Sequence, residues 1–228
     1  MDRLVNLKNI IMYLMADNRV SHRIPSTLEE RQRMMRALMN VWSSESIQAC
    51  LEGRVATNED EVNVWEPRPI SEDFLKMQDA ELQMQREDKG VVEISDITPQ
   101  TSDIRLWQGD ITRLKVEAIV NAANAQALGC WAPLHNCIDN CIHSAAGIQL
   151  RKECADKMQG RLLATGDAII TIMTRGRFCD HFCLDGCHLK IVLIIFKHIL
   201  LVDTPKHDMI DARTTLCPFL SRHVLMLC

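Results

Sequence analysis

Three residues whose side chains commonly bind zinc lie close together near the middle of the chain. Cys130, His135 and Cys137 form the pattern Cys-x4-His-x-Cys within the stretch GCWAPLHNCIDN. Zinc binds thiolate sulfurs and imidazole nitrogens, and catalytic zinc sites often use three protein ligands and leave a fourth position open for water or substrate. The spacing therefore predicts a zinc site with one open position.

This pattern also restricts the local backbone. His135 and Cys137 are two residues apart, so they cannot lie on one face of a helix and need an extended loop, which Pro133 favours. Two other interpretations stay open, namely a cysteine nucleophile with His135 as its base, and ordinary buried thiols. A nucleophile would need a positively charged environment to stabilise its thiolate, and the nearby Asp139 works against that.

Polar side chains that suit a nucleotide or sugar precede the cysteine loop. Asn121 and Asn124 follow a short apolar strand in IVNAANA, and amide groups both donate to and accept from sugar hydroxyls. Asp110 in QGDIT can accept hydrogen bonds from an exocyclic amine. In isolation each of these residues more often caps a turn, so they indicate a binding site only in combination with the cysteine–histidine loop.

The elements that must position these residues differ between the two halves of the chain. Residues 1–90 are predicted to be helical, because apolar residues recur at helical spacing. Ser26 with Glu29 predicts a capping box that opens the second helix, and Ser71 predicts the cap of a third. We interpret this methionine-rich region as helix packed on helix.

Residues 91–171 alternate between strand-like and helical patterns. Strands are expected in VVEISDI, DIRLWQGDIT, VEAIVNAANA and GDAIIT, and one helix in CIDNCIHSAAGIQLRKECADKM. Such alternation indicates an α/β fold, with a mixed or parallel sheet covered on both faces by helices. Ligands of such sheets bind at the carboxyl ends of strands, where QGDIT and NAANA lie.

Residues 172–228 have a different character. They hold half of the ten cysteines and five of the eight histidines, without clear caps or turn dipeptides. We expect the apolar run 191–202 not to form a designed strand of the sheet. This part also holds a cluster of metal-binding residue types, His181, Cys183, Cys187 and His188. We attribute that cluster to chance rather than to a second metal site.

Composition and charge exclude several classes of protein. The chain has 228 residues, of which 47% are hydrophobic, enough for a packed core. Its formal net charge of -4 provides no basic excess for binding nucleic acid. The sequence has no apolar run of about 20 residues that would cross a membrane, and its amphipathic start does not resemble a signal peptide. We therefore expect a cytoplasmic protein with reduced cysteines.

Taken together, QGDIT, VEAIVNAANA, GCWAPLHNCIDNCIHSAAG and GDAIIT resemble the macrodomain family. The joined pattern of NAAN and Cys-x4-His-x-Cys-Ile-Asp-Asn resembles the zinc-dependent macrodomains that remove ADP-ribose from proteins. ISEDFLKMQDAEL and KGVVEISDI resemble the amino-terminal extension of that subgroup. The resemblance ends near Thr171. It implies a helical extension (1–90), the first half of a three-layer α/β/α macrodomain (91–171) and an atypical or incomplete C-terminal part (172–228).

The resemblance implies a role for each residue of the site. Asp110 and Ile111 would contact the adenine end of ADP-ribose, and Asn124 would hydrogen-bond the distal ribose. The cysteine–histidine loop would hold Zn2+ against that ribose. The full set implied to bind the nucleotide is Asp110, Ile111, Asn121, Asn124, Cys137, Ile138, Asp139 and Asn140.

The implied reaction is hydrolysis of the glycosidic ester that joins mono-ADP-ribose to an acidic side chain of a protein. Zinc would position the ribose diol and stabilise developing negative charge. A carboxylate or a bound water would complete the proton transfers. Asn124 and Asp139 are the candidate catalytic residues, and Asp139 is the candidate for the carboxylate base. Two other functions stay open, an ADP-ribose-binding reader without turnover and a helical adaptor that binds a partner through residues 1–90.

The chain departs from the family pattern in one respect. Macrodomains surround the pyrophosphate with the backbone N–H groups of a second, glycine-rich loop. After Thr171 this sequence has only two glycines, Gly176 and Gly186, and no such loop. Because the pyrophosphate would lose these donors, we expect weaker binding of ADP-ribose and impaired activity.

Overall fold

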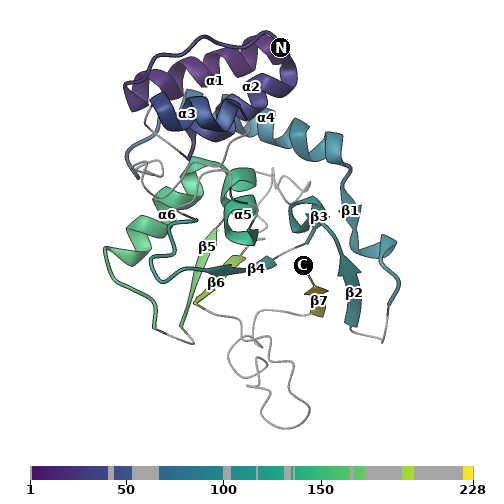
Figure 1. Ribbon diagram of the computed structural model, residues 1–228. Coiled ribbons are helices and arrows are strands. Elements are labelled where there is room, and N and C mark those ends of the chain that lie inside the picture. The colour runs from purple at the N-terminus through teal and green to yellow at the C-terminus, as the bar shows by residue number, and fades with distance from the viewer. Residues whose placement is uncertain are drawn as a thin grey trace.

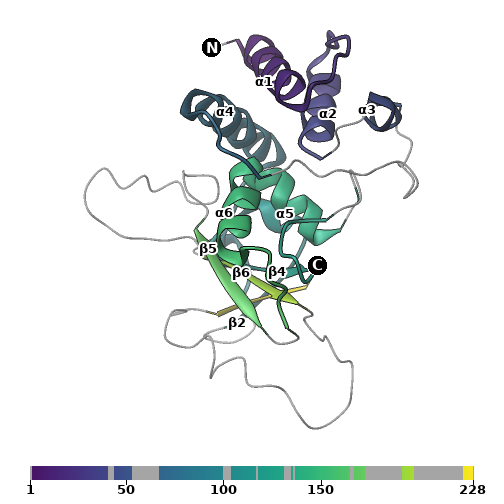
Figure 2. The same ribbon diagram turned by 90° about the vertical axis from the view of Figure 1, so that its left-hand side faces the viewer.

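The computed structural model describes residues 2–40, 44–52, 67–99, 104–116, 118–130, 135, 137–164, 167–172, 192–197 and 223–227. These residues form an N-terminal helical part and an α/β part. Figure 1 shows the helical part stacked on two further helices, α5 and α6, which in turn cover the strands. The same order of layers is visible after a quarter turn in Figure 2.

The described residues of the N-terminal part form four helices, one more than the three expected, because the helix over residues 44–51 was not predicted. They are α1 (Arg3–Asn18), α2 (Leu28–Leu38), α3 (Ser44–Leu51) and α4 (Glu72–Lys89). The predicted cap at Ser71 is confirmed, because its side chain accepts a hydrogen bond from the Phe74 N–H. The capping box predicted at Ser26 and Glu29 is wrong. The helix is capped one residue later by Thr27, whose hydroxyl accepts from the Glu30 N–H and donates to the Glu30 carboxylate at 2.6 Å, whereas in a capping box that carboxylate would accept from the backbone N–H of the cap residue.

The helical part is joined to the α/β part by a shared core. Apolar side chains of α1, α2, α3 and α4 pack together, and Ile148 of α6 (Ile148–Met158) belongs to the same cluster. Gln78, which is 0% exposed, accepts a hydrogen bond from the Ile148 N–H at 3.1 Å. Gly147 precedes α6 and has no side chain to cap it, so Gln78 supplies that cap from α4.

The strands form three small sheets in the described residues. The strands are β1 (Val92–Glu93), β2 (Ile104–Gln108), β3 (Leu114–Lys115), β4 (Ala118–Ala123), β5 (Ala168–Ile172), β6 (Val192–Lys197) and β7 (His223–Leu227). β6 lies between β4, which is parallel to it, and β5, which is antiparallel. β1 pairs with β3 and β2 with β7, both in parallel. The α/β class is therefore confirmed.

Two strands come from the C-terminal part, which corrects one expectation. The run 191–202 was not expected to form a designed strand, yet 192–197 is the central strand β6. The sequence VLIIFK is apolar and β-branched, which suits a strand flanked on both edges. The cluster from His181 to His188 lies outside the described residues.

The helix expected over residues 137–158 is in fact two helices. It is interrupted at Gly147, which has φ 86°, a conformation that favours glycine, and it divides into α5 (Ile138–Ala146) and α6. Among the described residues the helices lie on one side of the strands (Figure 2), so a second covering layer stays a prediction. No helix in this described part is both long and apolar enough to span a membrane.

Candidate functional site

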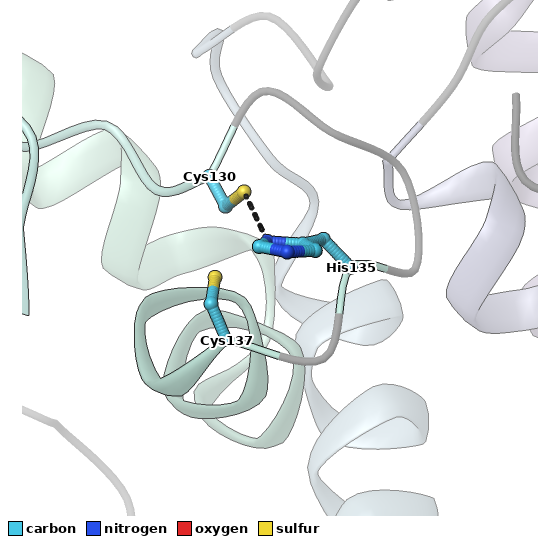
Figure 3. A group of neighbouring side chains, drawn as sticks. All are labelled: Cys130, His135 and Cys137. Atoms are coloured by element: carbon cyan, nitrogen blue, oxygen red, sulfur yellow. Dashed lines mark hydrogen bonds between the residues drawn. The ribbon is translucent and has the colours of Figure 1, made fainter. Parts of the chain in front are cut away.

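The side chains of Cys130, His135 and Cys137 converge (Figure 3). Cys130 Sγ lies 3.5 Å from His135 Nδ1, and one ligand atom from each of the three residues lies within 4.8 Å of the others. A tetrahedral zinc with bonds of roughly 2.3 Å to sulfur and 2.0 Å to nitrogen separates these two kinds of ligand by roughly 3.5 Å. The donors and their spacing therefore fit a zinc ion. Pro133, expected to extend the loop, lies outside the described residues.

Cys137 is placed by the beginning of α5. It is the N-cap of this helix, and its Sγ accepts a hydrogen bond from the Asn140 N–H at 3.4 Å. The Asn140 side chain donates to the His135 carbonyl at 2.9 Å, so one residue restrains two of the metal-binding residues. The N-terminus of a helix favours negative charge, which suits the thiolate that zinc requires.

Cys130 follows a turn that Asn124 closes. The Asn124 side chain donates to the Gly129 carbonyl at 2.9 Å and accepts from the Ala127 N–H at 3.1 Å. Gly129 has φ 88°, and a Cβ placed there would lie 3.0 Å from the His143 ring. The turn therefore depends on the absence of a side chain at position 129.

Replacing Gly129 with alanine should destabilise the protein and weaken metal binding. The left-handed backbone costs about 1–2 kcal/mol with a side chain present, and the crowding against His143 adds about 1–3 kcal/mol. Gly160 is a matched control, because it has φ 76° but no neighbouring atom within 4 Å of the position that a Cβ would take. Urea denaturation should show a larger loss for Gly129→Ala than for Gly160→Ala. Equal losses would contradict the role of this contact.

Arg151 of α6 hydrogen-bonds to the turn before Cys130, and the sequence analysis did not identify it as part of the site. It is 4% exposed, and its Nε donates to the Leu128 carbonyl at 2.7 Å. Its Nη1 donates to the Met39 carbonyl at 3.0 Å, at the end of α2. Burial lowers the pKa of Arg151 to about 10, so the guanidinium is still charged at neutral pH. The buried Arg151 thus connects the loop that carries Cys130 to the N-terminal helices.

Asp139, the predicted general base, is buried at 5% exposure between α5 and β4. Its Oδ1 accepts a hydrogen bond from the Asn121 side chain at 2.7 Å and lies 3.6 Å from His143 Nε2. Burial raises the pKa of Asp139, although Asn121 and Arg151 oppose the shift. Burial also lowers the pKa of His143 far below its usual value, so this imidazole is neutral. The catalytic role of Asp139 stays a prediction; in this structure it restrains Asn121, which lies within β4 and not after the strand as expected.

A cavity of about 420 Å³ lies between the N-terminal helices and α5. Of the residues predicted to form the site, Asp110, His135 and Asn140 line it. The cavity wall therefore includes both Asp110, which is implied to contact adenine, and His135, which is a candidate metal ligand. The predicted site residues that do not line it are Ile111, Asn121, Asn124, Cys130, Cys137, Ile138 and Asp139.

Asp110, which lines this cavity, is charged and already bound to Thr112 and Lys89. Its Oδ1 accepts hydrogen bonds from the Thr112 N–H at 3.0 Å and hydroxyl at 2.6 Å, and its Oδ2 lies 3.1 Å from Lys89 Nζ. Burial raises the pKa of Asp110, but the hydrogen bonds from Thr112 and Lys89 outweigh that effect and the net shift is downward. A ligand that contacts this carboxylate must compete with Lys89.

Comparisons with known proteins agree with the macrodomain resemblance. Residues 120–177 match the Macro domain family model. The protein-ADP-ribose hydrolase of Treponema medium is 40% identical over 170 residues, covering 71% of this chain and 56% of that protein. The protein-ADP-ribose hydrolase of Staphylococcus aureus (strain COL) is 47% identical over 113 residues, covering 48% and 42%. The chain thus spans about half the length of these curated relatives.

Solved macrodomain structures show a more distant likeness. The structure of the Trypanosoma brucei macrodomain in complex with ADP is 22% identical and gives a TM-score of 0.37, covering 57% of this chain and 55% of that one. The structure of the same macrodomain in complex with ADP-ribose gives a TM-score of 0.37 at 23% identity, covering 57% and 55%.

Proposed function

We propose that this chain is a zinc-dependent hydrolase that releases mono-ADP-ribose from acidic side chains of proteins. The observation that carries the proposal is the convergence of two thiols and an imidazole, with His135 on the wall of a cavity that Asp110 also lines. The names of the two curated relatives support the substrate class. The chain spans about half of the length of these relatives, so their activity is a proposal for this chain.

The chain's own residues hold and orient the reacting groups in this proposal. Hydrolysis adds water across the bond between the ribose carbon and the carboxylate oxygen, giving free ADP-ribose and a free acidic side chain. Zinc, when bound by the three ligands, supplies a Lewis acid that stabilises negative charge on oxygen. Asn140 restrains Cys137 and His135 and borders the cavity, which supports a metal site next to the proposed space for the substrate.

Two observations weigh against the alternative functions. A reader of ADP-ribose needs no metal at the ribose, whereas this loop brings three zinc-binding side chains together. A helical adaptor would present residues 1–90 to a partner. Here Gln78 and Arg86 of α4 instead bind the α/β part, with Arg86 Nη2 donating to the Leu114 carbonyl at 3.2 Å.

Removal of the metal tests the proposed reaction. The purified chain should release ADP-ribose from a protein mono-ADP-ribosylated on glutamate or aspartate. A zinc chelator should slow release at least about a hundredfold, because one strong electrostatic stabiliser is commonly worth that much, and added zinc should restore it. Release that is insensitive to the chelator would contradict zinc dependence. Binding of ADP-ribose without release would instead support a reader.

A further inference from the structure

The cavity between the N-terminal helices and α5 carries a surplus of positive charge. The described residues that line it include four cationic side chains and one carboxylate, namely Arg33, Arg36, Arg86, Lys89 and Asp110. Lys89 and Asp110 neutralise each other at 3.1 Å. Arg33 and Arg36 therefore add positive charge to the cavity wall beyond this neutralised pair.

Arg36 has unused hydrogen-bonding capacity. Its side chain is partly buried and donates to no partner among the described residues. Burial lowers the pKa of Arg36, and the positive charge of Arg33, three residues earlier on the same face of α2, lowers it further. Glu29 and then Glu81 exert opposing attractions on Arg36. The Glu81 carboxylate already accepts hydrogen bonds from Arg3, Gln32 and Gln85. An anion between the two arginines would relieve their repulsion.

We propose that Arg33 and Arg36 of α2 bind the pyrophosphate of ADP-ribose inside this cavity. This inference rests on the proposed function, which supplies a ligand with two linked phosphate groups. Guanidinium groups bind phosphate oxygens through paired N–H donors, and about 420 Å³ is within the usual size of a small-molecule site. The helical extension thereby contributes side-chain charge that the chain does not provide through a second glycine-rich loop.

Calorimetric titration with three probes tests this assignment. Inorganic pyrophosphate and ADP-ribose should both bind the full chain, and Arg36→Gln should weaken both at least about tenfold, as expected for the loss of a charge-assisted contact. Arg33→Gln should weaken them by a smaller factor, because Arg33 is exposed. Adenosine, which has no phosphate, should bind all variants alike. Arg23→Gln is the control, since Arg23 is an exposed arginine of the same extension that does not line the cavity.

The outcomes separate this inference from the proposed function. It is overturned if the unmodified chain does not bind pyrophosphate, if Arg36→Gln behaves like Arg23→Gln, or if adenosine binding falls in parallel. Arg36→Lys keeps the charge and should retain most of the binding. If Arg36→Gln does not fold, the test is whether Arg33→Gln weakens the binding of pyrophosphate and ADP-ribose. If pyrophosphate binding depends on the arginines but the chain releases no ADP-ribose, the result would contradict the proposed hydrolase activity and still support this pyrophosphate site.

Discussion

Replacing Cys137 with serine is expected to remove zinc and abolish the release of ADP-ribose while leaving the fold intact. A serine hydroxyl can accept the hydrogen bond from the Asn140 N–H that starts α5, so the helix keeps its cap. It does not replace a thiolate as a zinc ligand. The ratio of zinc to protein should fall from about one to near zero, and the rate of release at least about a hundredfold.

Two further variants separate the roles of this sulfur. Cys137→Ala should lose the metal and also about 1 kcal/mol of stability, because it loses the cap as well. Cys154→Ala is the thiol control. Cys154 is 0% exposed and burial raises its pKa to about 12, so it is neither a ligand nor a nucleophile. That variant should keep its zinc. A Cys137→Ser protein that retains zinc but releases no ADP-ribose would favour the cysteine nucleophile instead.

Replacing Arg151 with methionine is expected to cause the largest loss of stability. Methionine fills much of the same volume but leaves the Leu128 and Met39 carbonyls without their donor. Each unsatisfied buried carbonyl costs about 1–3 kcal/mol, so the free energy of unfolding should fall by about 2–6 kcal/mol. Because Leu128 lies two residues before Cys130, zinc affinity should fall too. Urea denaturation and zinc titration measure the two effects.

Arg161→Met serves as the control for this substitution. Arg161 is exposed and donates to the Met158 and Lys157 carbonyls at the end of its own helix. Its loss should cost less than about 1 kcal/mol and leave zinc binding unchanged. Similar losses from both variants would show that Arg151 does not connect the loop to the N-terminal helices.

The convergence of three candidate metal ligands was predictable from sequence because it depends on one short segment of the chain. Cys130, His135 and Cys137 are within eight positions of one another, so their types and spacing suffice to predict convergence. The helices of the first 90 residues were predictable for a similar reason, since periodicity and caps such as Ser71 are short-range signals. The break at Gly147 was missed because helical periodicity continues on both sides of it.

The long-range parts of the site could not be predicted in this way. The spacing of Arg33 and Arg36 places both on one face of α2, but nothing in a single sequence places that face over His135, about a hundred residues later. Arg151 was missed because an arginine in an amphipathic helix is usually exposed, and only the packed structure buries it. The strand β6 was missed because its pairing with β4 spans about seventy residues.

X-ray absorption at the zinc edge of the purified full chain tests the metal site itself. We expect one zinc per chain, with two sulfur ligands at about 2.3 Å, one nitrogen ligand at about 2.0 Å and a fourth, light-atom ligand. A chain that contains no zinc after purification and zinc supplementation, or a zinc without sulfur ligands, would contradict the assignment of Cys130, His135 and Cys137.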